Sequence, residues 1–175
     1  MAPSYPTPKS ITGGCLCNKL RYHVDFPADH NFETSCGTCQ CTQCRKQSGS
    51  LFLIYHRVAP ASTAFRFTSP TTALKTVRAS PKAERVICGE CGSWIYWKHS
   101  DKDYVCLTIG SIDPLYLFGE GAEDGGEVPA EGFGRVLVSC GGEHCWVGNE
   151  IKGVTDDIGL TGKGKGFRVV DGGEE

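Results

Sequence analysis

The sequence predicts a mainly β fold built from short antiparallel strands. Short runs rich in β-branched and aromatic residues recur along the chain, and Gly, Pro or Ser separates one run from the next. No long run shows the apolar period of an amphipathic helix. The expected strands cover residues 20–26, 51–58, 64–67, 74–77, 85–87, 94–98, 104–109 and 135–138.

Alternation is clearest in residues 93–98, which read Ser-Trp-Ile-Tyr-Trp-Lys. Successive side chains of a strand point to opposite faces of a sheet. We therefore expect Trp94 and Tyr96 to share one face, and Ile95 and Trp97 to share the other.

The 175 residues fit one domain. Residues 1–12 contain three prolines and few apolar side chains, which predicts a flexible lead. We expect one zinc-binding domain over 13–158. Within it, the acidic, Gly-rich residues 119–134 are typical of an exposed insertion. Residues 159–175 form the expected tail, with one further strand at 167–170.

Charge and hydropathy exclude two classes of partner. The formal net charge is −2, so the chain lacks the uniform basic face that binds nucleic acid. No window approaches the roughly 18 apolar residues of a membrane span, and the first residues lack the apolar core of a signal peptide. We expect a cytoplasmic protein without nucleic-acid or membrane partners. The sequence leaves its oligomeric state open.

The eleven cysteines are either a disulfide framework or thiolate metal ligands. An expected cytoplasmic location is reducing, and an odd number of cysteines cannot pair fully within one chain. Cys-x-Cys and Cys-x-x-Cys spacings also place two sulfurs on one turn, where both can face the same ion. These observations favour zinc over disulfides.

Two pairs of cysteines make up a first site. Cys15 with Cys17, and Cys88 with Cys91, supply the four sulfurs that a closed structural zinc requires. One ion held by all four would join the start of the domain to a hairpin in the middle of the chain.

Cys39, Cys41 and Cys44 make up a second site with one ligand fewer. A zinc ion on three protein ligands keeps a fourth position for water or substrate, so this is the catalytic candidate. Three thiolates suit a soft fourth ligand such as a substrate thiol. That thiol would lose its proton near neutral pH and attack a carbonyl carbon.

Together these motifs closely resemble the glutathione-dependent formaldehyde-activating enzyme (Gfa) family, also called the centromere protein V/Gfa domain. The resemblance lies in Gly13-Gly-Cys-Leu-Cys-Asn-Lys-Leu-Arg-Tyr, Cys39-Gln-Cys-Thr-Gln-Cys-Arg-Lys-Gln-Ser-Gly-Ser and Arg85-Val-Ile-Cys-Gly-Glu-Cys-Gly-Ser. Weaker matches are Gly110-Ser-Ile-Asp-Pro and His144-Cys-Trp.

The resemblance implies a β-tent-like fold with two zinc ions, one structural and one catalytic, on the two cysteine sets above. It also implies carbon–sulfur lyase chemistry. The expected reaction joins glutathione, as co-substrate, to formaldehyde and gives S-hydroxymethylglutathione.

Two residues depart from the family pattern. Gln40 stands where family members often carry His between the first two cysteines of the central motif, so a proton carrier is missing there. Cys36 forms an additional Cys-x-x-Cys with Cys39 and could supply a fourth thiolate, which would close the second site. A closed site would not catalyse.

Other side chains are candidates for the second site. Arg45 offers a bidentate fork for a substrate carboxylate, the alternative being a solvated surface charge. Ser48, Gly49 and Ser50 could bind substrate through backbone N–H and hydroxyl groups, or simply form a turn. His144 is a candidate proton carrier, or equally a buried structural histidine.

Three functions remain open at this point. The first is a zinc-dependent carbon–sulfur lyase or synthase acting on a small-molecule thiol and a carbonyl compound. The second is a zinc Lewis-acid lyase for a larger metabolite other than glutathione. The third is a scaffold without catalysis in which both zinc ions are structural. Cys106 is expected in the core, and Cys140 and Cys145 receive no role.

Overall fold

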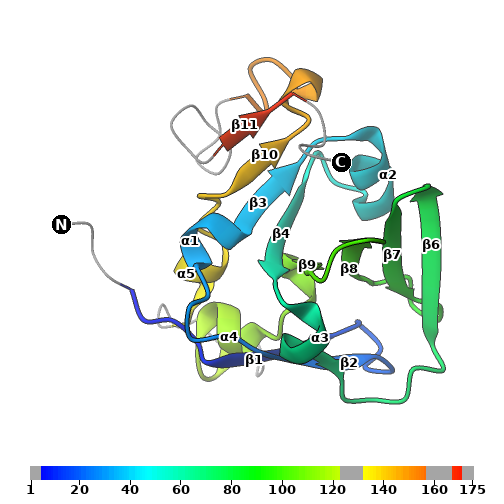
Figure 1. The fold of residues 1–175 in the computed structure, drawn as a ribbon, viewed down its shortest axis with the longest axis vertical. Coiled ribbons are helices and arrows are strands. Elements are labelled where there is room, and N and C mark those ends of the chain that lie inside the picture. Colours follow the sequence, from blue (N-terminus) through cyan, green and yellow to red (C-terminus); the bar gives the residue numbers. More distant parts are fainter. Residues whose placement is uncertain (1–4, 123–131, 157–166, 171–175) are drawn as a thin grey trace.

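The computed structural model describes residues 5–122, 132–156 and 167–170, and its strands form two sheets (Figure 1). The strands are β1 (Ser10–Gly14), β2 (Arg21–Asp25), β3 (Cys36–Cys39), β4 (Leu53–Val58), β5 (Phe65–Phe67), β6 (Leu74–Ser80), β7 (Ala83–Cys88), β8 (Trp94–His99), β9 (Val105–Thr108), β10 (Glu143–Cys145) and β11 (Phe167–Val169).

The helices are short. They are α1 (Phe32–Ser35), α2 (Thr42–Ser48), α3 (Ala61–Ala64), α4 (Pro114–Phe118) and α5 (Gly134–Leu137), with 3-10 turns η1 (Ile109–Ser111) and η3 (Val147–Asn149). Within the described ranges, none of these helices is long and apolar enough to span a membrane.

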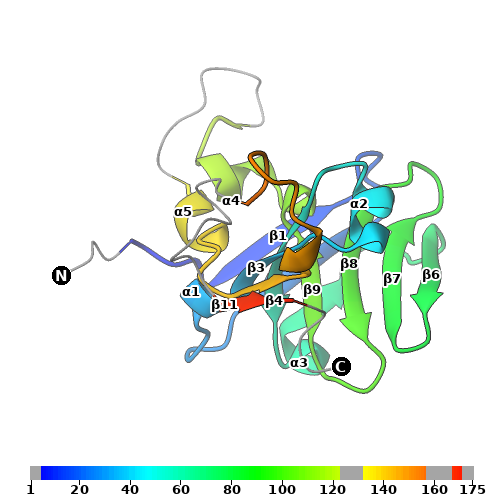
Figure 2. The same ribbon diagram turned by 90° about the horizontal axis from the view of Figure 1, so that it is seen from above.

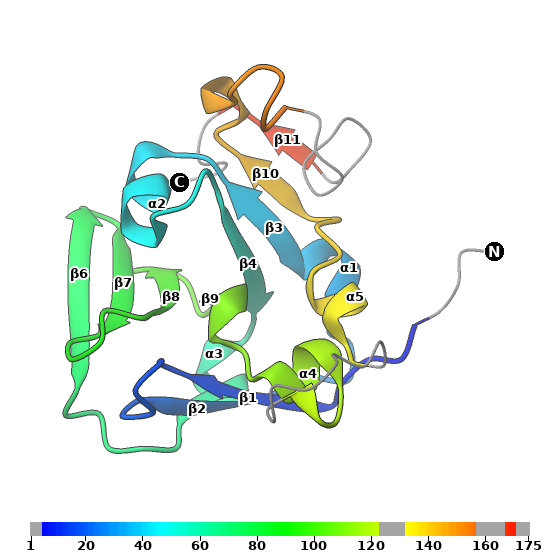
Figure 3. The same ribbon diagram turned by 180° about the vertical axis from the view of Figure 1, so that it is seen from behind.

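The small sheet has the order β1-β2-β5, and the large sheet has the order β11-β10-β3-β4-β9-β8-β7-β6. Neighbouring strands are antiparallel, except that β10 runs parallel to both β3 and β11. In Figure 1, β1 and β2 lie across the base, with β6 and β7 on one side and β3 and β10 on the other; Figure 3 shows the same arrangement from behind. The prediction of a mainly β fold with antiparallel strands is confirmed.

The main core lies where the small sheet meets the large one. In β1 and β2, buried and partly exposed residues alternate, so that Ile11, Tyr22 and Val24 point inward. They pack with Val58 and Leu107 from the large sheet. Each such aliphatic side chain contributes roughly 1.5–3 kcal/mol when fully buried. This core holds β1 in place and, with it, the first cysteine pair.

A second apolar cluster lies elsewhere on the large sheet, beside α2. Figure 2 shows α2 from above, beside the large sheet. The buried members of this cluster are Cys39, Cys44, Leu53, Tyr55, Trp94, Cys106 and Cys145.

Seven of the eight expected strands are confirmed as β2 and β4 to β9, and the expected strand at 167–170 is confirmed as β11. The strand expected at 135–138 is wrong, because these residues belong to helix α5 and its C-terminal end. Leu137 is fully buried in the main core, and the Phe133 N–H bonds to the Tyr116 carbonyl at 2.7 Å. These contacts with α4 outweigh the strand propensity of the two valines.

The expected alternation in residues 94–97 is also wrong. Ile87 pairs with Trp94, whereas Val86 pairs with Tyr96, so the register shifts at this point of β8. A bulge of one residue reverses the faces on one side of it. Trp94 therefore joins the cluster beside α2, and Tyr96 joins the main core.

The expected boundaries shift at the N-terminal end. Strand β1 begins at Ser10, so the expected lead of residues 1–12 overlaps the first strand by three residues. Most of the expected insertion, residues 123–131, lies outside the described residues, as do residues 159–166 and 171–175 of the expected tail and the last two residues of the expected domain.

Candidate metal centres

The structure brings Cys15, Cys17, Cys88 and Cys91 together, although Cys17 and Cys88 are 71 residues apart. All four sulfurs lie within 4.8 Å of one another. The Sγ–Sγ distances are 3.5 Å for Cys15 and Cys17, and 3.7 Å for Cys17 and Cys88. We call this group the four-cysteine cluster.

Two turns hold the four-cysteine cluster. One turn joins β1 to β2, and the other follows β7 and includes Gly92 at φ +77°, a conformation that favours glycine. Ser93 connects the two turns, because its Oγ accepts the Leu16 N–H at 3.0 Å and lies 3.2 Å from the Cys91 sulfur. Four sulfurs in this arrangement match the donor set of a closed structural zinc site.

Cys39, Cys41 and Cys44 form a second group, the three-cysteine cluster, with their sulfurs also within 4.8 Å of one another. Cys39 ends β3, and Cys41 is the N-cap residue of α2. The Cys41 sulfur accepts the backbone N–H of Cys44 at 3.3 Å. Helix α2 ends at Gly49, whose left-handed conformation (φ +66°) lets its N–H reach the Arg45 carbonyl.

Cys36 does not join the three-cysteine cluster. It lies three residues before Cys39 on β3, so the two side chains point to opposite faces of the sheet. The Cys36 sulfur instead lies 3.4 Å from the sulfur of Cys140, and both residues are fully buried. The fourth thiolate that the sequence allowed for is therefore directed away from the site.

The ionisation of the three sulfurs is linked. Hydrogen bonds from Cys39 and Cys44 lower the pKa of Cys41 to about 2, and the contacts with Cys41 and Cys44 raise the pKa of Cys39. Sulfurs this close stabilise one negative charge among themselves, whereas a divalent cation allows all three to ionise.

A buried arginine lies beside this cluster. Arg85 on β7 is only 6% exposed, and its Nη2 donates to Gln43 Oε1 at 2.5 Å. Its Nε and Nη1 have no hydrogen-bond partner, and no carboxylate among the described residues pairs with it. Its positive charge acts on Cys44. A buried unpaired charge is costly.

The three-cysteine cluster and Arg85 together fit a zinc ion. Three thiolates and one divalent cation carry one negative charge in total, which a single guanidinium balances. The donor set and the unpaired arginine therefore both agree with a bound divalent metal.

Arg45 lies on α2 next to Cys44, but its guanidinium already has acceptors within the chain. Its Nε donates to the Leu51 carbonyl at 2.7 Å, and its Nη2 donates to the Asn149 carbonyl at 2.5 Å and to Gln40 Oε1 at 3.0 Å. Arg45 fastens three segments together, so the structure does not support its expected role as a carboxylate clamp.

His144 also lies away from the thiolates. On β10 it is in register with Thr38, while Cys145 is in register with Cys39. His144 therefore points to the face opposite Cys39, where its Nδ1 is 2.7 Å from Thr38 Oγ1. Of the two readings that the sequence left open, this position favours the buried structural histidine and not the proton carrier.

Gln40, which replaces the more usual histidine, is 1% exposed and anchors nearby segments. Its Oε1 accepts from Thr155 Oγ1 at 2.8 Å as well as from Arg45. Its backbone N–H donates to the Cys145 carbonyl at 3.1 Å. The residue at this position is thus used to hold the C-terminal part of the domain.

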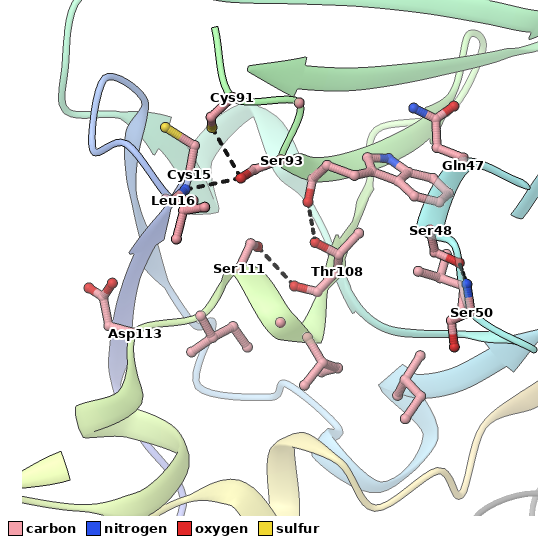
Figure 4. A pocket seen from close by; sticks show the side chains of 18 of the residues that line it. Cys15, Leu16, Gln47, Ser48, Ser50, Cys91, Ser93, Thr108, Ser111 and Asp113 are labelled. Atoms are coloured by element: carbon pink, nitrogen blue, oxygen red, sulfur yellow. Dashed lines mark hydrogen bonds between the residues drawn. The ribbon is translucent and has the colours of Figure 1, made fainter. Parts of the chain in front are cut away.

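A cleft of about 800 Å³ lies between the four-cysteine cluster and the C-terminal end of α2 (Figure 4). Figure 4 shows Cys15 and Cys91 on one side and Ser48 and Ser50 on the other. The lining residues used below are Arg21, Ser48, Ser50, Leu53, Trp94, Thr108, Ser111 and Asp113.

Of the four residues expected to bind substrate, Ser48 and Ser50 line this cleft, but Arg45 and Gly49 do not. The Ser48 hydroxyl donates to the Cys44 carbonyl at 2.7 Å and accepts the Ser50 N–H at 3.2 Å. The Gly49 N–H is used to cap α2. These groups thus form turn structure at the rim.

The three-cysteine cluster does not line the cleft. Leu53 and Trp94 line it and also pack in the apolar cluster that contains Cys39 and Cys44. These two side chains therefore lie both in the wall of the cleft and against the cysteines. For the chemistry, the position of the thiolates is the better guide to the site than the size of the cleft.

Residues 10–123 match the profile of the family described as "Glutathione-dependent formaldehyde-activating enzyme". The chain belongs to this family. The matched residues of this family member contain both cysteine clusters. Strands β10 and β11 follow the matched residues in the sequence.

Two further comparisons add little about function. A Rhodobacter sphaeroides protein with a crystal structure shares 20% sequence identity with this member of the formaldehyde-activating family, and the two structures superpose with a TM-score of 0.48. The match covers 68% of this chain and 98% of that one. No curated protein matches the chain.

Two residues beside the three-cysteine cluster are not among the expected site residues. Arg85 interrupts the apolar strand that leads to Cys88, which is the one signal that could have found it. Cys145 stands in the weaker match His144-Cys-Trp, but its place beside Cys39 depends on the parallel pairing of β10 with β3.

Proposed function

We propose that this protein is a zinc-dependent carbon–sulfur lyase or synthase that joins or cleaves a thiol–carbonyl adduct at the three-cysteine cluster. The family description supports glutathione and formaldehyde as the thiol and the carbonyl compound. The four-cysteine cluster takes the structural role, since all its four donors come from the chain.

The orientation of Cys36 carries this proposal. With Cys36 turned toward Cys140, three sulfurs remain, which is the donor count of sites that also bind water or substrate. When bound there, zinc supplies Lewis-acid chemistry and lowers the pKa of a thiol that reaches it.

The residues of the chain perform the remaining tasks. Cys39, Cys41 and Cys44 hold the metal, and Arg85 balances the negative charge of the three thiolates. Trp94 and Tyr55 pack beside the cysteines and limit the access of water. In the synthase direction the thiol sulfur bonds to the carbonyl carbon, and the thiol proton ends on the carbonyl oxygen. The lyase direction reverses both changes.

The cytoplasm is the compartment that fits this activity. All eleven cysteines are free thiols in the structure, which supports a reducing compartment. Small-molecule substrates are the only partners that the proposal requires.

NMR exchange spectroscopy tests this proposal. The rate of exchange between glutathione, formaldehyde and their adduct is measured without protein, with zinc-loaded protein and with Cys44→Ala protein. Because the adduct also forms without an enzyme, only the rate is informative. We expect acceleration by the zinc-loaded wild type alone. Equal rates in all three samples would favour the scaffold hypothesis.

The cleft favours a second candidate, a lyase for a larger and less charged substrate. Its volume of about 800 Å³ is that of a site for a sizeable ligand. Glutathione carries two carboxylates, yet the one arginine among the described lining residues, Arg21, is paired with Asp113 through both Nη atoms. Other lining groups, such as Thr108 and Ser111, are neutral.

Calorimetry separates the two candidates. Neutral thioethers and neutral thiol adducts of increasing size are titrated into the zinc-loaded protein, with glutathione as the reference. Tighter binding of the larger neutral compounds supports the second candidate. Specific binding of glutathione alone would exclude it.

A further inference from the structure

The strand after the family match reaches the three-cysteine cluster. Residues 10–123 match the family, and β10 (Glu143–Cys145) adds to the large sheet beside β3 (Figure 3). In this parallel pair Cys145 is in register with Cys39, the first residue of the cluster. Registered residues of neighbouring strands share a face, so the two thiols point the same way.

Contacts on this face confirm where the Cys145 side chain lies. It is 7% exposed and packs in the same apolar cluster as Cys39, Cys44 and Tyr55. Its sulfur is 3.9 Å from the Tyr55 hydroxyl, and it lies close enough to Cys41 to interact with the charge of that thiolate.

Three hydrogen bonds fasten the segment that contains Cys145 to the cluster. The Cys145 carbonyl accepts the Gln40 N–H at 3.1 Å. The Asn149 carbonyl accepts a hydrogen bond from Arg45 Nη2 at 2.5 Å, and Thr155 Oγ1 donates to Gln40 Oε1 at 2.8 Å. The segment therefore bonds directly to Gln40, the residue between the first two cysteines, and cannot drift from the site without breaking these bonds.

We propose that Cys145 is a fourth, exchangeable thiol ligand of the metal held by Cys39, Cys41 and Cys44. This inference rests on the proposed function in one respect, the exchange with a substrate thiol. The Cys145 sulfur lies outside the group within 4.8 Å, so ligation requires a change of its side-chain rotamer. The backbone bond to Gln40 keeps the strand in place during that change.

The exchange step balances without a further reactant. Cys145 would give up its place as a ligand of the metal, and the sulfur of the incoming thiol would take that place. The proton of the incoming thiol passes to the Cys145 sulfur, so the total charge at the site does not change. Release of the product reverses both transfers. In this way Cys145 receives the proton for which His144 and Gln40 are not placed.

Nearby side chains agree with this assignment. Two guanidinium groups lie on this side of the sheet: Arg85 acts on Cys44, and Arg57 acts on Cys145. Burial raises the pKa of Cys145, and the charge of Arg57, which also pairs with Glu143, opposes that rise. The other nearby cysteines are less well placed. Cys36 faces the opposite side of the sheet, and Cys106 lies on β9, the second strand from β3.

Cobalt substitution tests the assignment. The thiolate-to-cobalt charge-transfer absorbance grows with the number of bound thiolates, and it is measured for wild type, Cys145→Ser and Cys106→Ser proteins. We expect Cys145→Ser to lose about one eighth of the wild-type absorbance, that is one thiolate of the eight in two filled sites. Cys106→Ser removes another buried thiol of the same apolar cluster and should absorb like the wild type.

Glutathione titration of the cobalt proteins tests the exchange. In the wild type glutathione replaces Cys145, so the absorbance should stay constant. In Cys145→Ser it should fill a vacant position, restore the lost absorbance and bind at least tenfold more tightly, because no internal thiol competes. Equal absorbance of wild type and Cys145→Ser before titration would overturn the assignment. If Cys145→Ser loses one thiolate of absorbance but the zinc-loaded wild type does not accelerate the exchange in the NMR assay, Cys145 remains a ligand and the proposed function is rejected.

Discussion

Arg85→Met separates the charge of the buried guanidinium from its volume. Methionine keeps an apolar stem of comparable length and removes the positive charge. In the metal-free second site, Arg85 has two nitrogens without a hydrogen-bond partner, which is unfavourable by about 1–3 kcal/mol. The substitution should therefore raise the stability of the protein that lacks the second metal.

The effect on metal binding should have the opposite sign. At an effective dielectric constant of about 20, a neighbouring unit charge contributes roughly 3–4 kcal/mol. Removing it from the anionic centre of three thiolates and zinc should weaken metal binding about a hundredfold, since about 1.4 kcal/mol corresponds to a factor of ten.

The assay combines two measurements. Urea unfolding is followed with one equivalent of zinc, which the four-cysteine cluster takes first, and a competing chelator then gives the affinity of the second site. Arg78→Met is the matched control, because Arg78 lies on the neighbouring strand β6 with a side chain that is 65% exposed. An Arg85→Met protein that is less stable and binds metal normally would show that Arg85 serves packing alone.

Three further predictions concern acid, the Gln40 contact and the metal. Burial lowers the pKa of His56 to about 4, so between about pH 6.5 and pH 4 only the unfolded state gains a proton at this residue. The free energy of unfolding should therefore fall by about 3 kcal/mol as the pH drops through this range. In urea titrations, the free energy of unfolding of His56→Gln should depend less steeply on pH than that of the wild type. An unchanged slope would contradict this. Thr155→Val removes a buried donor to Gln40 and should lower the free energy of unfolding by about 1–2 kcal/mol, with a null effect counting against the contact. Acid should release zinc from the three-cysteine cluster at a higher pH than from the four-cysteine cluster, because its fourth ligand, Cys145, is exchangeable and only three thiolates hold the ion throughout. A metal indicator would show two steps, and simultaneous release would argue against unequal sites.

Local patterns in the sequence predicted most of the fold. Strands such as β4 and β9 carry enough β-branched and aromatic residues to be found without tertiary information. The strand expected at 135–138 failed because contacts with α4 decide the conformation of those residues. The faces of Trp94 and Tyr96 failed because a bulge, which leaves no trace in composition, shifts the register.

The candidate site was predictable where ligand spacing is local. The turn around Cys39, Cys41 and Cys44 places three sulfurs together whatever the rest of the chain does. The position of Cys36 follows from the alternation of side chains along a strand, but the sequence did not show that Cys36 and Cys39 lie on the same strand, β3. For Arg45 and His144 the sequence left two readings open, because their partners, Asn149 and Thr38, are 104 and 106 residues away and local spacing does not show them.

The zinc content of three proteins distinguishes the assigned ligands from the other cysteines. We infer that the chain has two metal sites and that Cys36 belongs to neither. Elemental analysis after gel filtration should therefore find two zinc ions per chain in the wild type and in Cys36→Ala, and one in Cys44→Ala. Loss of one zinc ion from Cys36→Ala, or two retained by Cys44→Ala, would contradict the assignment of the reactive site.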